Sequence, residues 1–175
     1  DMDGTFYLGD ALLPGAREFL AACKQKGIPY TFLTNNSSKS GEDYLQKLAG
    51  LGVKAEPEQM FTPGDATLLY MEEQHFPKEI LLVGTDNLER QFAAAGYDIH
   101  AARPKAVVLG FDTGIHYQKL TDLCNAVRAG LPYIATHPDL NCPVPGGFVP
   151  EIGAVIAFVR AATGRQQDVV VGKPH

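Results

Sequence analysis

The sequence begins with two aspartates placed two residues apart and followed by glycine and threonine, Asp1-Met2-Asp3-Gly4-Thr5. In an extended stretch, residues i and i+2 lie on the same side of the backbone, so the two carboxylates can act on one ligand. Displacement at phosphorus needs a nucleophile and a proton donor, and Asp1 and Asp3 can divide these roles. Gly4 lets backbone amides approach an anion, and Thr5 adds a hydroxyl donor. The pentapeptide therefore favours a phosphate-handling site.

The same five residues also have a simpler interpretation, because aspartate and glycine are ordinary turn residues. A surface turn or a loose metal loop remains open at this point. The segment does not match a calcium loop, because Thr5 occupies the third ligand position and the glycine comes too early.

Two further polar segments follow β-prone runs far along the chain. The apolar run 28–33 ends in a set of hydroxyls and amides, Thr34-Asn35-Asn36-Ser37-Ser38. The run 168–171 ends in Gly172-Lys173-Pro174. Both patterns indicate a strand that ends in a polar loop.

These three segments resemble, in order, three of the four motifs of the haloacid dehalogenase-like (HAD) superfamily of hydrolases. The resemblance is to its NagD-like, 4-nitrophenylphosphatase and phosphoglycolate phosphatase branch. Residues 1–5 match the first motif, 32–36 the second and 172–174 the third, and 135–139 with Gly153 also resemble this branch. The resemblance spans nearly the whole chain.

The resemblance implies a role for each matching residue. Asp1 would be the nucleophile that forms an aspartyl-phosphate, and Asp3 would protonate the leaving alcohol and then activate water. Thr34 and the Asn35 amide would hold the phosphoryl oxygens, and Lys173 would orient Asp1 and the phosphate. A Mg²⁺ cofactor would contact the Asp1 carboxylate and the backbone carbonyl of Asp3. Phosphatases of the superfamily have an aspartate two residues after the nucleophile, as Asp3 is here, whereas its dehalogenases do not.

The fourth motif of the family supplies further acidic magnesium ligands beyond the lysine, and no counterpart occurs before residue 175. We therefore expect an internal fragment whose remaining metal ligands lie beyond residue 175. By itself such a fragment should be weak or inactive, and the activity would belong to the intact parent chain.

Composition narrows the class of protein further. The chain has 175 residues, a net charge of −5 and 45% hydrophobic residues. Without a basic patch it is not expected to bind nucleic acid, and no apolar run approaches the roughly 20 residues of a membrane span. Three scattered cysteines, Cys23, Cys124 and Cys142, fit a reducing cytoplasm.

Apolar patterning predicts alternating strands and helices, and therefore an α/β fold with parallel sheets. Strands are expected at 80–83, 106–109 and 133–135, a Pro/Gly-rich loop at 138–147, and a helix at about 153–162. The resemblance implies a Rossmann-like core, incomplete here, with an inserted α/β cap. The expected division is residues 1–77 as the first part of the core, 78–164 as the cap, and 165–175 as the return to the core.

The cap loop that begins at His137 is expected to select the substrate, because it resembles by position the specificity loop of the branch. Asp139, Asn141 and Cys142 would face the leaving group, and Asn36 of the second motif is also expected to bind the substrate. The alternative is that the prolines of this loop only stiffen a connection and Asp139 caps a turn. His137 is expected to be a turn or packing residue. The branch has Pro-Gly-x-Gly where this chain has Glu151 in place of the first glycine.

These expectations combine into a Mg²⁺-dependent phosphomonoester hydrolase that acts on a small phosphorylated metabolite. Two alternatives remain: a phosphotransferase that uses an alcohol acceptor, and a catalytically silent small-molecule-binding protein of the same fold. Members of this branch often pair through their caps, so the resemblance allows a homodimer.

Overall fold

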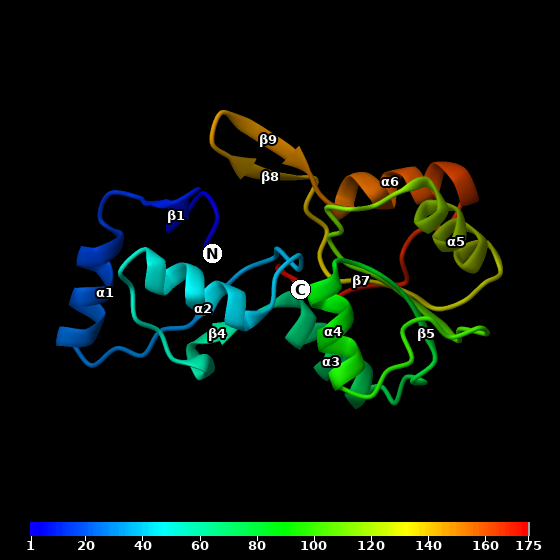
Figure 1. The fold of residues 1–175 in the computed structure, drawn as a ribbon, viewed down its shortest axis with the longest axis horizontal. Helices are drawn as coiled ribbons and strands as arrows, with labels where there is room; N and C mark the ends of the chain where they lie inside the picture. The colour runs from blue at the N-terminus through cyan, green and yellow to red at the C-terminus, as the bar shows by residue number, and fades with distance from the viewer. Residues whose placement is uncertain (175) are drawn as a thin grey trace.

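The computed structural model describes residues 1–174, which form two α/β units joined side by side along the long axis (Figure 1). The N-terminal unit covers residues 1–62 and contains one antiparallel and one parallel strand pair. β3 and β4 pair in parallel, with Phe32 opposite Met60. Its elements are β1 (Tyr7–Leu8), β2 (Ala11–Leu12), α1 (Ala16–Gln25), β3 (Phe32–Leu33), α2 (Gly41–Gly50), a 3-10 turn (Pro57–Gln59) and β4 (Met60–Phe61).

The C-terminal unit, residues 63–171, is built on a four-stranded parallel sheet of order β10-β7-β6-β5. Its strands are β5 (Ile80–Val83), β6 (Ala106–Leu109), β7 (Tyr133–Ala135) and β10 (Val169–Val170). Its helices are α3 (Pro63–Glu73), α4 (Asp86–Ala94), α5 (Tyr117–Arg128) and α6 (Ile152–Thr163). A hairpin of β8 (Asn141–Val144) and β9 (Gly147–Pro150) leaves this unit and reaches over the N-terminal unit (Figure 1).

Alternate residues of the parallel sheet build two separate cores, as expected for strands that are covered on both faces. Val107 and Leu109 of β6 pack with α5 and α6, whereas Ala106 and Val108 pack with α3 and α4. The result is a three-layer arrangement, with α3 and α4 below the sheet and α5 and α6 above it in Figure 1. This rigid unit fixes the positions of the loops that leave its strands.

The predicted α/β class with a parallel sheet is confirmed, and so are the strands at 80–83, 106–109 and 133–135. The loop prediction for 138–147 was wrong, because residues 141–150 form the β8–β9 hairpin. A high proline and glycine content also suits a tight hairpin turn. Gly146 supplies the required positive φ of 85°, and Pro143 lies in a two-stranded ribbon where a missing N–H is tolerated.

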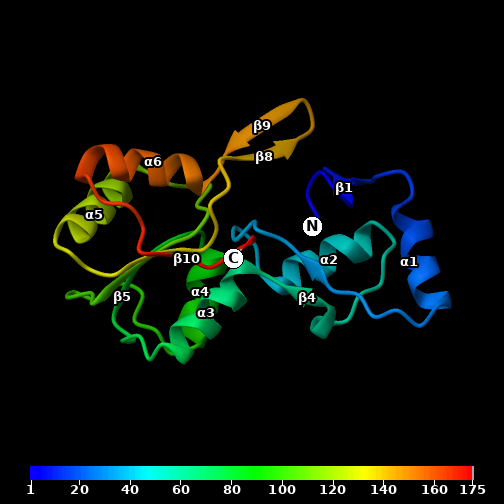
Figure 2. The ribbon, with the colours of Figure 1, turned by 180° about the vertical axis from the view of Figure 1, so that it is seen from behind.

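Two elements lie differently from the expected division of the chain. α3 falls within the segment expected to be core, yet its Met71 packs against Ile80 of the C-terminal sheet. β10 pairs in parallel with β7, in that same sheet, before the chain runs back between the two units (Figure 2). The division into core and cap at residues 78 and 164 stays a prediction.

None of the helices in residues 1–174 has the length and apolar character that crossing a bilayer requires.

Candidate active site

The polar segments singled out in the sequence meet around one cavity of about 230 Å³ between the two units. The loop that begins at Asp1, the loop after β3 and the start of the hairpin each contribute to its wall. Gly4 lies so close to Pro143 of the hairpin that a Cβ there would be 2.8 Å from its ring, and its φ is +74°. Glycine therefore allows the hairpin to close against the Asp1–Thr5 loop. The wall includes Asp1, Asp3, Thr34, Asn35, Asn36, Asp139, Asn141 and Cys142.

Asp1 forms an ion pair with the lysine that follows β10. Lys173 Nζ lies 2.7 Å from Asp1 Oδ1, and the same oxygen accepts a hydrogen bond of 2.9 Å from the backbone N–H of Met2. Within residues 1–174, both bonds to this carboxylate go to Oδ1. Burial lowers the pKa of Lys173, and the negative charge of Asp139 opposes this shift. The pair joins residues 172 positions apart at the cavity.

Asp3 lies deeper than Asp1, beside two groups that sequence reasoning did not identify. The Tyr7 hydroxyl donates to Asp3 Oδ2 over 3.3 Å, and Lys47 Nζ of α2 lies 3.8 Å from Asp3 Oδ1. Burial raises the pKa of Asp3, whereas Lys47 and the Tyr7 hydrogen bond act to lower it. A raised pKa suits a carboxyl that must hold and then release a proton.

Tyr7 and Lys47 are themselves connected, because the Lys47 ammonium lies 3.9 Å from the centre of the Tyr7 ring. The spacing of the two residues, one in β1 and one in α2, gives no sign of this contact. Only the packing of α2 against the N-terminal loop brings them to Asp3.

The loop after β3 is organised by its own side chains. The backbone N–H of Asn36 donates to Thr34 Oγ1 over 3.0 Å, and the Asn36 side-chain oxygen accepts a hydrogen bond from the backbone N–H of Ser38. Ser40 and Asp43 then form a reciprocal capping box that starts α2. Thr34 is buried at the cavity wall as a result.

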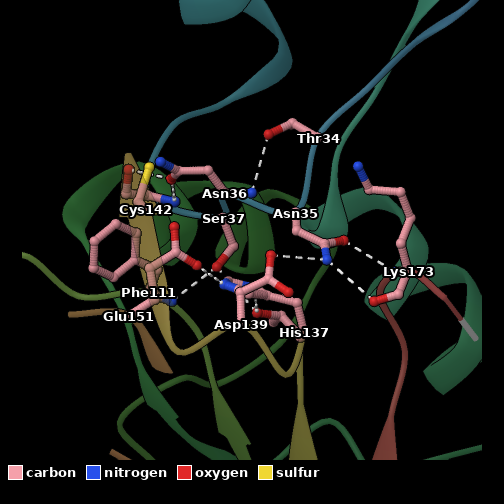
Figure 3. A network of polar contacts seen from close by, with 12 residues as sticks. Thr34, Asn35, Asn36, Ser37, Phe111, His137, Asp139, Cys142, Glu151 and Lys173 are labelled. Atoms are coloured by element: carbon pink, nitrogen blue, oxygen red, sulfur yellow. Dashed lines mark hydrogen bonds and ion pairs between the residues drawn. The ribbon is translucent and has the colours of Figure 1, made fainter. Parts of the chain in front are cut away.

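The Asn35 side-chain amide forms hydrogen bonds through both its nitrogen and its oxygen (Figure 3). Its Nδ2 donates to Asp139 Oδ2 over 3.0 Å and to the Lys173 carbonyl over 3.1 Å. Its Oδ1 accepts a hydrogen bond of 3.0 Å from the backbone N–H of Lys173. The side-chain amide of Asn35 thus joins the loop after β3 to two distant segments.

Asn141 and Cys142 of β8 line the cavity, and their predicted contact with the leaving group stays a prediction. Asn141 is exposed, whereas Cys142 is buried. Burial and the nearby Glu151 and Asp3 carboxylates raise the pKa of the Cys142 thiol to about 12. Cys142 is therefore a neutral thiol and not a nucleophile at neutral pH.

Behind the cavity, His137 and Glu151 form a buried pair that continues into the N-terminal unit. His137 Nε2 lies 2.6 Å from Glu151 Oε2, and His137 Nδ1 lies 3.1 Å from the Thr136 hydroxyl. The Thr136 hydroxyl lies 3.0 Å from Ser37 Oγ in the loop after β3. Glu151 also lines the cavity. Its departure from the branch pattern was the only sequence signal for this role.

Two groups of side chains offer metal ligands. Asp1 and Asp3 provide carboxylate oxygens at the cavity, which is the hard donor type that Mg²⁺ prefers. Ligand atoms of His137, Asp139 and Glu151 lie within 4.8 Å of one another. Both ring nitrogens of His137 are already engaged in this second group. The Asp1 carboxylate, together with the backbone carbonyl of Asp3, therefore suits a magnesium ion, and the second group fits a hydrogen-bonded network.

A parallel sheet covered by helices, next to a cavity lined by two aspartates of which one is paired with a lysine, defines an α/β protein with a carboxylate-based site. Residues 1–98 match the family model of the haloacid dehalogenase-like hydrolases. The chain belongs to this family, and the predicted family is confirmed.

Three known proteins illustrate the similarity. An acid sugar phosphatase of Staphylococcus aureus (strain MRSA252) is 35% identical over 176 residues, which span 100% of this chain and 68% of that protein. The structure of a 4-nitrophenylphosphatase from Thermotoga maritima has a TM-score of 0.94 at 45% identity, over 99% of this chain and 67% of that one. A glycerol phosphate phosphatase from Mycobacterium tuberculosis, solved in complex with magnesium, has a TM-score of 0.88 at 31% identity, over 99% of this chain and 53% of that one.

Proposed function

We propose that the cavity is the active site of a Mg²⁺-dependent phosphomonoester hydrolase, which acts through an aspartyl-phosphate on a small phosphorylated metabolite. The carrying observation is the 2.7 Å contact between Lys173 Nζ and Asp1 Oδ1, because Asp1 lines a cavity together with Asp3 and Thr34. Relatives named as sugar, glycerol and 4-nitrophenyl phosphatases support this reaction class. Sugar phosphates are therefore the first substrates to test.

In the first half of the reaction, an Asp1 carboxylate oxygen attacks phosphorus while the bond to the leaving alcohol breaks. Asp3 gives its proton to the leaving oxygen, so that a neutral alcohol departs. In the second half, Asp3 takes a proton from water, the water oxygen attacks the phosphoryl group, and Asp1 is released. The raised pKa of Asp3 supports its assignment to both proton transfers.

The remaining cavity groups serve the charge of the transferring phosphoryl group. The Thr34 hydroxyl and the backbone amide of Asn35 are assigned to its oxygens, because the Asn35 side chain is engaged elsewhere. Lys173 orients the Asp1 carboxylate and offsets negative charge. A Mg²⁺ held by Asp1 and Asp3 would supply further positive charge against the phosphate. Fixed charges of this kind contribute most of the rate in phosphoryl transfer.

We assign the C-terminal unit to the covering role of a cap. Its hairpin packs on Gly4 and Gly9 through Pro143 and Pro145, and this contact supports water exclusion and substrate selection at the cavity. Asn36, Asn141 and Cys142 are assigned to the leaving group. The three free cysteines support a cytoplasmic location.

The test is phosphate release by the full-length protein from 4-nitrophenyl phosphate and from a panel of sugar phosphates. We expect release with Mg²⁺, its loss with a chelator, and its return when Mg²⁺ is added back. Release that is unchanged by the chelator would contradict the metal assignment. No release from a folded, metal-loaded protein that still binds phosphate would favour the silent binding protein.

A phosphotransferase is the second candidate, because Asp3 can activate an alcohol as well as water. Adding a second alcohol such as glycerol separates the two reactions. For a hydrolase, free phosphate and 4-nitrophenol appear in equal amounts. A shortfall of free phosphate, with unchanged release of 4-nitrophenol, would favour transfer to the alcohol.

A further inference from the structure

Three segments that are distant in the sequence are joined at the Asn35 side chain. The loop after β3 carries Asn35, the segment before the hairpin carries Asp139, and the segment after β10 carries Lys173. Figure 3 shows the Asn35 amide between the Asp139 carboxylate and the Lys173 backbone. Three hydrogen bonds of 3.0 to 3.1 Å connect them. This junction is the clamp discussed below.

The chemistry of the clamp fixes the orientation of Asn35. An asparagine amide has two N–H donors, and both are used here, one by Asp139 and one by the Lys173 carbonyl. The carboxylate can only accept when it is ionised, so it holds the nitrogen end of the amide with a charge-assisted bond. The oxygen end then faces the backbone N–H of Lys173.

The segment that carries Lys173 packs closely against this clamp, and no side chain would fit at Gly172. A Cβ on Gly172 would lie 2.6 Å from the Thr136 carbonyl oxygen and 2.9 Å from Asn35 Oδ1. The backbone of residues 172–173 is therefore located by contacts on two sides. From this position the Lys173 side chain reaches Asp1, with Nζ 2.7 Å from Oδ1.

We propose that Asp139 is a positioning residue for the reaction: it locks Asn35, whose two bonds to the backbone of Lys173 place the ammonium group on Asp1. This inference rests on the proposed function, and it differs from a role of Asp139 in contacting the leaving group. Asn141 provides the contrast, because it is exposed at the same cavity two residues further along the chain, at the start of β8. Asp139 acts on the nucleophile, through protein groups alone.

The kinetic test compares Asp139→Ala, Asp139→Asn, Lys173→Ala and the double variant Asp139→Ala/Lys173→Ala in the full-length protein. We expect Asp139→Ala to lower kcat about 10- to 100-fold, because small misplacements of a catalytic group cost this much. The factor should be the same for 4-nitrophenyl phosphate and a sugar phosphate, with KM within about 3-fold of wild type. Asp139→Asn should recover most of kcat, because its amide oxygen can still accept from Asn35.

The double variant decides between positioning and direct contact. If Asp139 acts through Lys173, Asp139→Ala should lower kcat by less than about 2-fold once Lys173 is alanine, because coupled residues are not additive. Asn141→Ala is the matched control, and its effect should fall on KM and change with the substrate. Independent losses from Asp139→Ala and Lys173→Ala, or an Asp139→Ala effect confined to the KM of one substrate, would overturn the proposal.

Binding of inorganic phosphate, measured by calorimetry on the wild type, Asp139→Ala, Lys173→Ala and the double variant, tests the clamp without turnover. We expect Asp139→Ala to weaken phosphate binding about 3- to 10-fold in the presence of Lys173 and to have no effect without it. Equal weakening in both backgrounds would overturn the clamp even if the protein hydrolyses phosphate esters. A wild type that binds phosphate without hydrolysing any ester would contradict the proposed function and leave the clamp measurable. Melting temperatures would show whether each variant is folded.

Discussion

Two aspartate–lysine pairs have the same separation of 2.7 Å, one beside the cavity between the two units and one within the C-terminal unit, and their surroundings differ. Asp1 lines the cavity and pairs with Lys173, and the two side chains are 49% and 35% exposed. Asp112 and Lys119 lie beyond β6, with side chains 2% and 27% exposed. Asp112 also accepts a backbone hydrogen bond from Gly114, and Lys119 donates to the Gly84 carbonyl. The same two residue types can therefore serve a site beside the cavity and the fold within the C-terminal unit.

This difference shows that polar residues directly after a strand are not enough to form an active site. Thr85 follows β5 as Thr34 follows β3, but Thr85 caps α4 and donates to the Ser38 carbonyl. At these two places in the C-terminal unit, the polar groups cap a helix or pair with neighbouring protein groups and do not line the cavity. In the N-terminal unit they meet groups from three other segments at an open cavity. Convergence of distant segments is the feature that distinguishes the candidate site.

The largest expected effect comes from the aspartates. Asp1→Asn should lower kcat by at least about 10⁴-fold, because it removes the nucleophile. Asp112→Asn is the matched control and should leave kcat within about 3-fold of wild type, since it lies outside the cavity. Steady-state release of 4-nitrophenol measures both. Comparable losses in the two variants would remove the distinction between the two units.

Replacing Lys173 should lower kcat less than replacing Asp1 does. The two lysine variants should also differ in kind, because Lys173→Ala should lose mainly activity and Lys119→Ala mainly stability. Lys173→Ala should lower kcat by about 10²- to 10³-fold, because it removes one preorganised charge from the site. Its pair is solvent-exposed, so unfolding should become easier by about 1 kcal/mol at most. Steady-state kinetics and urea unfolding test the two statements. A destabilised protein with normal kcat would show that the pair is structural.

Lys119→Ala should show the reverse pattern. It leaves the buried Asp112 carboxylate without its ion-pair partner, which should lower the free energy of unfolding by about 3 kcal/mol. The kcat of the folded fraction should stay within about 3-fold of wild type, because the pair lies outside the cavity. Urea unfolding followed by circular dichroism measures the first quantity. A loss of kcat without a loss of stability would contradict the structural role.

The smallest expected effect concerns the two threonines. Thr85→Val should cost about 1 kcal/mol of stability, because it removes the N-cap of α4. Thr34→Val is the matched variant, and it should lower kcat about 10-fold or more through loss of a hydrogen bond to the phosphoryl group. Thermal unfolding and steady-state kinetics on both variants complete the comparison. Equal effects on kcat would weaken the assignment of Thr34.

The sequence predicted the strands of the C-terminal sheet, and several of the residues that it singled out line the cavity. Strands such as 80–83 and 106–109 are apolar and β-branched, so that local composition is enough to identify them. Asp1, Asp3 and Thr34 were identified because each lies in a short motif, residues 1–5 or 32–36, that can be recognised from a few neighbouring residues. The contact between Lys173 and Asp1 was expected only from the resemblance to a family.

Features that depend on packing between distant segments were missed. Tyr7 and Lys47 reach Asp3 because α2 packs on the N-terminal loop, and neither residue lies in a motif. Glu151 lines the cavity through its bond to His137, which is 14 residues away across the hairpin. The hairpin itself was hidden by its proline and glycine content, because the same residues form open loops and tight turns. Such features follow from tertiary structure and leave little trace in local sequence.

The central claim is that Asp1 carries the phosphoryl group during the reaction, and trapping that group on Asp1 tests it most directly. The full-length Asp3→Asn variant should react with 4-nitrophenyl phosphate, because 4-nitrophenolate leaves without a proton, and then stall for lack of a base to activate water. Acid quench and mass spectrometry should then find phosphate on the peptide that contains Asp1, together with a burst of one 4-nitrophenol per protein. A burst with phosphate on another residue, or steady turnover with no phosphorylated protein, would contradict the account.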